Sequence, residues 1–340
     1  MHGALFSAGD DFNMYPKLRE NVWHIDPQRE TAMLITSRAT YEVPTERALQ
    51  FLRMRSYCTG WHSIDSIAEK SGFSVADVNA LLGSLEPAGI IYTNSDLDEK
   101  LPQEHVRDVL TRACRIWSAE LQISYIGNEF SAGQLQKSVL IGWLLEMYHY
   151  VRDFPFAIEH GARHATGALK DVLMTYAEQE KGHEGFVLRS LVNVGISVPE
   201  VESSIPLLST RLIGFLMREL FELMPAAALL VAAVIEAQGF SEAEIENFKA
   251  KLHEHYGIGA HALDPYFEHQ KIDVDMGHAE LLASNLDLIR IEDRRTLDLV
   301  VNKIHDLKHA FDLQGIEIKA YFAALNGKYV PRQPVDFEAI

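Results

Sequence analysis

The chain is poor in cysteine: Cys58 and Cys114 are the only two among 340 residues, and they lie far apart in the sequence. Two thiols are too few for a disulfide framework or for a cysteine-ligated zinc site. Disulfide-rich domains belong to oxidising compartments, so this composition favours the reducing cytoplasm. The first residues, MHGALFSAGDDF, also lack the basic segment and apolar run of a secretory signal.

Long hydrophobic runs and positive charge are scarce as well. The longest apolar stretch covers residues 223–235, contains Pro225 and is too short to span a bilayer. The net charge of −17 repels phosphate backbones and anionic lipid head groups. We therefore expect neither nucleic acid nor a membrane as a partner.

Residues 1–98 differ in pattern from the rest of the chain. A segment rich in β-branched residues, 31–43, predicts short strands. A helix, two shorter helices with Ser63 and Ser74 as capping residues, and the strand-like segment IIYT follow it. This order is typical of a winged helix, a small α+β domain. Its presumed recognition helix, VADVNALLGSL, has no Lys or Arg, which argues against DNA reading.

A polar segment at 94–105, NSDLDEKLPQEH, predicts a linker between two domains. Apolar residues at helical spacing then predict an all-helical domain over residues 106–330. The fold class we expect is therefore mainly α, a helical bundle preceded by a small α+β domain. The expected helices cover 105–124, 131–151, 155–162, 165–194, 207–238, 241–255, 260–286 and 293–326.

Acidic residues and histidines recur in three helical segments, AEQEKGHEGF, LLVAAVIEAQGF and PYFEHQKIDVDMGHAELL. Residues three or four apart share one face of a helix, the arrangement that places metal ligands in helical bundles. Three carboxylates with three histidines suit iron or manganese and leave positions for water and dioxygen. The candidate ligands are Glu180, His183, Glu236, His269, Asp273 and His278.

Each part of this set has an ordinary explanation when taken alone. Glu180 and His183 can form a solvated helix pair, and His269 and Asp273 a surface ion pair. Glu236 can mark the point where a buried helix becomes exposed. Their joint occurrence favours a metal site, because a carboxylate beside a long uncharged run is costly unless it is paired or metal-bound.

The order of these residues, E…H, then E after an apolar helix, then HxxxD…H, resembles the haem-oxygenase-like diiron oxidases and oxygenases, relatives of PqqC and the TenA-like proteins. The strings EKGHEGFVLRSLVNVG, AAVIEAQGF, HYGIGAHALDPYFEHQKIDVDMGHAELL and LLEMYHYVRDFPFAIEH carry the resemblance over residues 110–325. It implies two Fe(II) ions held by the six candidates, with manganese as the alternative metal, and a catalytic part for Glu180 and Glu236. It also implies dioxygen as co-substrate, an external electron donor, a homodimer, and a substrate pocket lined by Glu146, Tyr148 and His149.

The N-terminal domain resembles the PqqD-like family of peptide-binding winged helices through YCTGWHSIDSIAEKSGFS and LLGSLEPAGII. This resemblance implies a peptide or peptide-linked substrate, with an amino acid or a fatty-acid-like molecule as the alternative. Domain packing or dimerisation is the other role open to this module. The reactions open to the whole chain are N-oxygenation, desaturation and C–C cleavage.

The third ligand segment departs from the family pattern. The family's last histidine falls three residues after the aspartate, where this chain has Met276. His278 lies five residues after Asp273, about 140° around an ideal helix. Either a π-bulge near Gly277 corrects the direction, or Asp275 replaces Asp273 as the ligand.

Other functions are open from the sequence. One alternative is a metal-free, PqqC-like oxidase, and another is a peptide-binding scaffold without catalysis. A TenA-like hydrolase would need a nucleophilic cysteine, for which Cys114 is the only candidate in the helical domain. Two further histidine pairs, His160 with His164 and His305 with His309, have no nearby carboxylate helix in the pattern, so we expect structural or surface roles for them.

Overall fold

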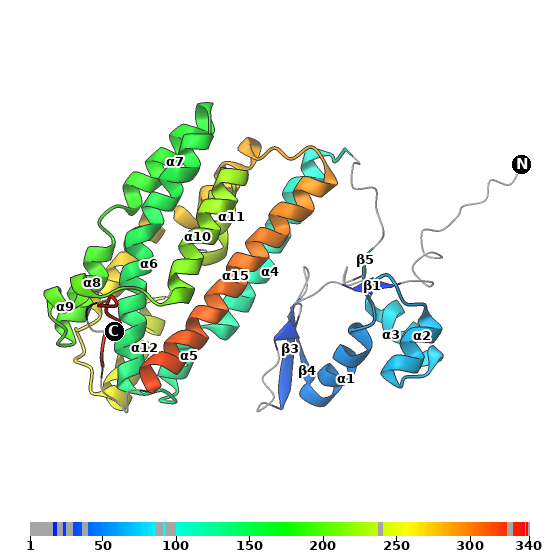
Figure 1. Ribbon diagram of the computed structural model, residues 1–340, viewed down its shortest axis with the longest axis horizontal. Coiled ribbons are helices and arrows are strands. Elements are labelled where there is room, and N and C mark those ends of the chain that lie inside the picture. Colours follow the sequence, from blue (N-terminus) through cyan, green and yellow to red (C-terminus); the bar gives the residue numbers. More distant parts are fainter. Residues whose placement is uncertain are drawn as a thin grey trace, which may run out of the picture. The chain divides into compact units, whose positions relative to one another are not determined.

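The computed structural model describes residues 16–18, 23–24, 30–35, 40–85, 91–92, 100–236, 241–324, 329–336 and 338. It divides the chain into two compact units, Met1–Glu99 and Lys100–Ile340. The first unit combines strands with short helices, and the second is helical (Figure 1). The predicted fold class, mainly α with a small α+β part, is confirmed.

In the first unit, three helices pack around a small core. They are α1 (Thr45–Arg55), α2 (Ile64–Ser71) and α3 (Val75–Leu85). The Ser63 hydroxyl accepts a hydrogen bond from the Ser66 amide, and the Ser74 hydroxyl accepts one from Asp77, so both predicted caps form. Between these helices Gly72 has φ 77°, the left-handed conformation that ends α2. Phe51 is among the side chains of the core.

The strands of the first unit form two small antiparallel sheets. In one sheet β3 (Thr31–Ile35) lies between β2 (Trp23–His24) and β4 (Thr40–Pro44). In the other, β1 (Lys17–Leu18) pairs with β5 (Ile91–Tyr92). Strand β5 follows the helical pair as a wing strand does, which matches the predicted order of elements.

The second unit is built around the long helix α6, which packs against α7, α8, α10 and α15. Helices α10 and α15 also pack together, and α11 packs on α4 (Figure 1). Aromatic and aliphatic side chains from these helices are buried in the core. The helices are α4 (Gln103–Ser124), α5 (Ile126–Ser131), α6 (Lys137–His164), α7 (Gly167–Glu180), α8 (Glu184–Asn193), α9 (Val198–Ser203), α10 (Leu208–Leu223), α11 (Ala227–Ile235), α12 (Glu242–Tyr256), α13 (Asp264–Asp275), α14 (Leu281–Ser284) and α15 (Arg294–Ala323), with two short 3₁₀ turns, η2 (His278–Glu280) and η3 (Leu286–Leu288).

Two of the predicted helix bounds are wrong at prolines, for opposite reasons. Pro155 lies inside α6 without ending it, because this helix is held by neighbours along its length. Pro225 does divide the predicted helix 207–238 into α10 and α11. Met224 has the extended conformation that a following proline favours, which ends α10 at Leu223.

Glycine divides the predicted helix 165–194. Lys181 is extended and Gly182 has φ 88°, so α7 ends at Glu180 and α8 begins at Glu184. This break lies inside the predicted Glu180–His183 pair, and it changes how the two side chains come together.

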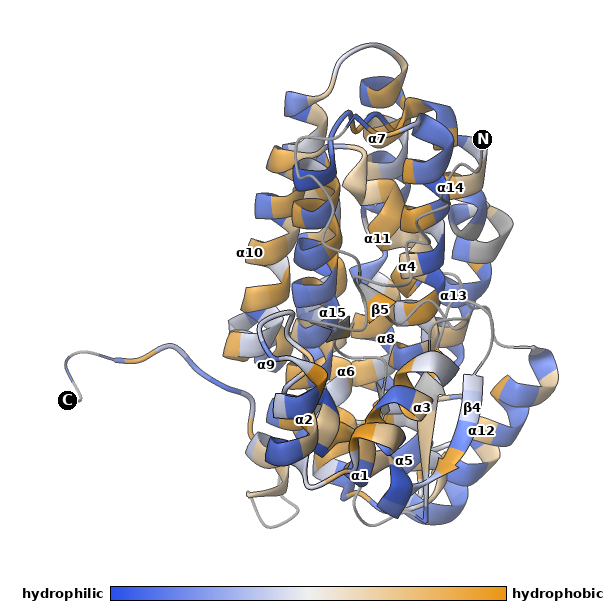
Figure 2. Ribbon diagram, turned by 90° about the vertical axis from the view of Figure 1, so that its right-hand side faces the viewer, coloured by the Kyte–Doolittle hydropathy of each residue, from blue (hydrophilic) through white to orange (hydrophobic). Residues whose placement is uncertain are grey.

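Helix α11 consists of apolar residues, AALLVAAVI, and Figure 2 shows it as strongly hydrophobic. Most of its side chains are buried. Glu236 directly follows its last residue, so one carboxylate lies at the C-terminal end of an apolar helix. Within the described residues, no helix is both long enough and apolar enough to cross a membrane.

Candidate metal centre

The turn between α7 and α8 brings Glu180 and His183 together. Glu180 is the last residue of α7 and His183 immediately precedes α8. The His183 amide donates to the Glu180 carbonyl oxygen at 3.4 Å, which closes the turn. The imidazole Nδ1 of His183 then lies 3.4 Å from Oε2 of Glu180. The predicted pair therefore forms through a turn around Gly182 and not through one helix face.

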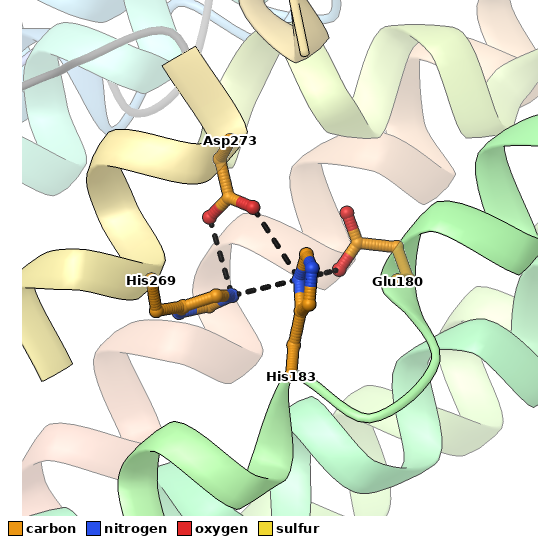
Figure 3. Close-up of side chains that lie close together, drawn as sticks. All are labelled: Glu180, His183, His269 and Asp273. Carbon is orange, nitrogen blue, oxygen red and sulfur yellow. Dashed lines mark hydrogen bonds and ion pairs between the residues drawn. The ribbon is translucent and has the colours of Figure 1, made fainter. Parts of the chain in front are cut away.

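Helix α13 supplies two further candidate ligands to the same place. His269 and Asp273 are one turn apart, with Nε2 and Oδ2 at 3.2 Å. Nε2 of His269 lies 3.0 Å from Nδ1 of His183, and Oδ1 of Asp273 lies 3.4 Å from that same nitrogen. Figure 3 shows the four side chains of Glu180, His183, His269 and Asp273 pointing toward one common point.

A second group shares Glu180 with the first. Nδ1 of His278 lies 3.0 Å from Oε1 of Glu180 and 3.1 Å from Oε2 of Glu236. Glu180 therefore turns one oxygen toward His183 and the other toward His278. In each group, one ligand atom per residue lies within 4.8 Å of all the others. The structure brings all six predicted ligands together as two adjoining sets.

The chain reaches His278 by ending α13, so the predicted π-bulge is wrong. Helix α13 stops at Asp275, and Gly277 takes φ 74° before His278 begins a 3₁₀ turn. A left-handed glycine redirects the backbone, so His278 does not have to point away from Asp273 as it would on one continuous helix. Asp273 lies in the cluster, whereas the alternative ligand, Asp275, has a side chain outside the described part of the structure.

The ligand atoms are buried and leave polar groups without partners. Glu180, His183, His269 and His278 are all buried. Nε2 of His278 has no hydrogen-bond partner among the described residues, and Nδ1 of His278 has ion-pair contacts only, such as those to Glu180 and Glu236. Unsatisfied buried polar atoms are costly, and a coordinated cation removes that cost. The donor set, carboxylate oxygens with imidazole nitrogens, therefore fits a pair of iron or manganese ions.

The pKa values of these groups reflect crowding of charge. Burial acts to raise the pKa of Glu180, but the imidazoles of His183 and His278 outweigh it and lower this pKa to about 2. Burial acts to lower the pKa of His278, but Glu180 and Glu236 raise it to about 10. In the metal-free protein His278 therefore carries a proton at neutral pH. Metal binding has to release this proton.

The pKa of Asp273 is raised and that of His269 is lowered, the reverse of the shifts at Glu180 and His278. Burial, followed by the charges of Glu180 and Glu236, raises the pKa of Asp273 to about 7. Burial, followed by the neighbouring His183, lowers the pKa of His269 to about 4. His269 is therefore neutral at physiological pH, the state in which an imidazole binds a metal.

Two tyrosines beside the centre were not found by sequence reasoning. The Tyr176 hydroxyl donates to Oε1 of Glu236, and its ring meets the ring of His278 edge-on at 5.0 Å. The pKa of the Tyr150 phenol is raised by burial and then by the charges of Glu236, Glu180 and Asp273. Its hydroxyl has no hydrogen-bond partner among the described residues. Tyr150 is thus a buried donor close to the acids.

If the candidate centre holds iron, replacing Tyr176 by Phe is expected to weaken its binding about 10- to 100-fold, because Glu236 loses the hydrogen bond that orients it. Competition titration with a chromophoric ferrous chelator measures this effect. Tyr256→Phe is the matched control, since its buried hydroxyl donates to the Phe130 carbonyl, outside the cluster. Equal iron affinity in both variants would contradict the orienting role.

The predicted pocket residues on α6 have other contacts. Glu146 accepts hydrogen bonds from the Leu207 amide at 3.0 Å and from the Thr210 hydroxyl, at the start of α10. Nε2 of His149 lies 2.9 Å from the Ser204 hydroxyl. Tyr148 is a member of the hydrophobic core. These contacts favour structural roles for the three side chains over the predicted substrate contact.

Glu146 gives the protein a specific dependence of stability on pH. Burial, only partly offset by its hydrogen bonds to Thr210 and Leu207, raises its pKa to about 7. An unfolded glutamate titrates near pH 4.3, so the folded state binds the extra proton between about pH 4.3 and 7. The stability that this group contributes is therefore present at low pH and lost as the pH rises through that window.

We expect Glu146→Gln to flatten the pH dependence of the free energy of unfolding between about pH 4.3 and 7. Urea unfolding at several pH values measures the slope for wild type and variant. Glu202→Gln is the control, because Glu202 is exposed on the nearby α9. A Glu146 variant with the wild-type slope would show that this carboxyl does not control the dependence.

The remaining sequence candidates are not members of the two ligand groups. Cys114 is buried on α4, its thiol donates to the Leu230 carbonyl oxygen, and burial raises its pKa to about 12. A thiol held protonated in this way is a poor nucleophile. Both cysteines are free and buried. The ring of His305 lies against Trp117, with centroids 5.7 Å apart, which agrees with a structural role.

Comparison with known proteins defines the fold of the second unit. No known family model matches the chain, and no curated protein matches it. A solved domain of unknown function with a haem-oxygenase-like fold, from Shewanella denitrificans OS217, is 17% identical at a TM-score of 0.53, over 68% of this chain and 99% of that one. This chain thus has a haem-oxygenase-like helical fold.

Two other solved structures are similar at lower scores. A TenA homologue from P. horikoshii OT3 is 14% identical, with a TM-score of 0.47 over 63% of this chain and 98% of its own. A TenA homologue from Pseudomonas syringae pv. tomato str. DC3000 is 13% identical, with a TM-score of 0.45 over 65% of this chain and 100% of its own.

Proposed function

We propose that this chain is a non-haem diiron oxidase or oxygenase that uses dioxygen. The observation that carries the proposal is the pair of buried ligand groups that share Glu180. A bridging carboxylate between two sets of imidazole and carboxylate ligands is the arrangement of diiron centres in helical bundles. In this assignment His183, His269 and Asp273 hold one ion, and Glu236 and His278 hold the other.

The charges of the set agree with two divalent ions. Glu180, Glu236 and Asp273 contribute three negative charges when ionised, and the imidazoles are neutral once His278 has lost its proton. The carboxylates therefore offset most of the charge of two divalent cations. When bound, the two ferrous ions supply the electrons for reduction of dioxygen.

The protein contributes geometry and exclusion of water. The two groups are held by the α7–α8 turn, the end of α11, α13 and η2, so their positions depend on four separate elements. The Tyr176 hydroxyl orients Glu236 through its hydrogen bond. Phe154 stacks on Tyr150 with ring centroids 5.7 Å apart and meets Tyr176 edge-on at 5.9 Å. Phe154 thus packs against both tyrosines, and the buried Tyr150 hydroxyl, which has no partner among the described residues, is left as a donor for a bound molecule.

The substrate class that we propose is a peptide-linked or amino-acid-like molecule, with N-oxygenation, desaturation or C–C cleavage as the outcome. The first unit supports this through its order of elements, strands, three helices and a further strand, which agrees with the winged helix expected from the sequence. In the described sheet β4 has a neighbour on one side, β3. An extended peptide can add to such a strand through main-chain hydrogen bonds.

Anaerobic addition of ferrous iron followed by oxygen tests the proposal. We expect both ions to bind, and oxygen to cause an optical change and consumption of a candidate peptide or amino acid. Mössbauer spectra of the oxidised protein should show a coupled pair of irons. Full turnover in the presence of a strong chelator would overturn the assignment and favour the metal-free oxidase. Absence of both iron binding and turnover would favour the scaffold.

A further inference from the structure

The C-terminal ends of α6 and α10 carry a second group of metal-binding side chains, separate from the buried centre. His160 and His164 lie one turn apart at the end of α6, and Glu222 lies one residue before the end of α10. One ligand atom from each lies within 4.8 Å of the others. Nε2 of His160 is 3.5 Å from Oε2 of Glu222, and the two imidazole rings are 5.2 Å apart.

A glycine explains why these three side chains meet. A Cβ built on Gly161 would lie 2.8 Å from Cβ of Phe221, closer than packed carbon atoms approach. Helices α6 and α10 therefore pack closely at this point because position 161 has no side chain. His160 and Glu222 are the direct neighbours of these two contact residues, so the close approach places them opposite each other.

The local electrostatics favour a cation. Both helices end here, and the unpaired carbonyl groups of a helix C-terminus carry partial negative charge. Nε2 of His160 is buried and has no hydrogen-bond partner among the described residues. Glu222 and His164 are exposed, so an ion can reach the group from solvent and keep water as a further ligand.

We propose that His160, His164 and Glu222 bind a single zinc-class divalent ion. Two imidazoles and one carboxylate are a tetrahedral zinc donor set with the fourth position left to water. A histidine pair at i, i+4 on one helix presents both rings on the same face. The bound ion links the end of α6 to the end of α10, just before the Pro225 turn that leads into α11. The site therefore stabilises the segment that positions Glu236.

Zinc titration of the iron-loaded protein tests this site. The wild-type protein is expected to bind one zinc ion in addition to its iron. His164→Ala and Glu222→Gln should each bind this zinc ion at least about tenfold more weakly (about 1.4 kcal/mol). The zinc-dependent rise in melting temperature should shrink in both variants. His309→Ala is the matched control, because its i, i+4 partner is His305 and no carboxylate joins them in a metal-binding group of the described residues.

The iron content separates this site from the buried centre. Iron per chain should be the same in wild type, His164→Ala and Glu222→Gln. Unchanged zinc affinity in both variants would overturn the proposal. A zinc loss that is matched by an equal loss of iron would also overturn it, because it would place the zinc in the buried centre.

Discussion

In the proposed diiron centre, Glu180→Ala is expected to remove both iron ions and to abolish oxygen-dependent turnover. Glu180 turns Oε2 toward His183 at 3.4 Å and Oε1 toward His278 at 3.0 Å, so each ion loses a ligand. We expect each to bind at least about a hundredfold more weakly, roughly 2.7 kcal/mol, because Glu180 belongs to both ligand groups and would contribute its charge to both ions. Iron analysis after anaerobic loading and desalting measures the loss.

The matched control for this variant lies on the same helix. Glu178 is two residues earlier on α7, and its side chain is 73% exposed, so Glu178→Ala removes an equal charge without touching the centre. It should keep wild-type iron. Far-ultraviolet circular dichroism of both variants checks that the helices remain. Wild-type iron in the folded Glu180 variant would refute the shared-ligand assignment.

The sequence was enough to predict which residues form the centre, but only in part which helices and turns position them. Glu236 was found because it follows an uncharged run, and burying a carboxylate there requires a partner. Glu180 and His183 were found from their spacing, although Gly182 breaks the helix that the spacing assumed. A turn and a helix both place residues i and i+3 close together, so the pairing was found even though the element was wrong.

For His278, helical periodicity could not predict the direction of the side chain. Its direction depends on the left-handed φ of Gly277, and glycine occurs in many conformations. Tyr176, in contrast, had a usable signal, because it lies one turn before Glu180 and so shares its face. Tyr150 lies on the helix that the resemblance places along the pocket, but nothing in the sequence distinguishes it from the core aromatic residues of that helix.

Contacts between distant segments decided the remaining differences. Glu146 was expected in a substrate pocket, yet its partners Leu207 and Thr210 lie at the start of α10, some sixty residues later in the sequence. Likewise, His160 and His164 seemed to lack a carboxylate because Glu222 reaches them only through the packing of two helices. Sequence periodicity describes the faces of one helix and does not identify the helix that covers each face.

Glu236→Ala and His278→Ala are both expected to leave one iron in place. The two side chains belong to the same group, with His278 Nδ1 3.1 Å from Glu236 Oε2. The other ion keeps His183, His269, Asp273 and one oxygen of Glu180. Iron per chain should therefore fall by half in each variant, in contrast to the complete loss in Glu180→Ala. Oxygen-dependent turnover should be lost in both, because a single ferrous ion supplies fewer electrons to dioxygen than a pair does.

The spectroscopic signature of this half-occupied state is specific. A lone high-spin ferric ion gives an electron paramagnetic resonance signal at low field, whereas an antiferromagnetically coupled diferric pair gives none. Both variants should show that signal after oxidation, and His261→Ala should not, because its imidazole is 89% exposed and outside the cluster. Equal behaviour of the Glu236 and His278 variants follows from their sharing one ion. If one of them lost both irons while the other lost none, the division of the six side chains into two adjoining groups would be wrong.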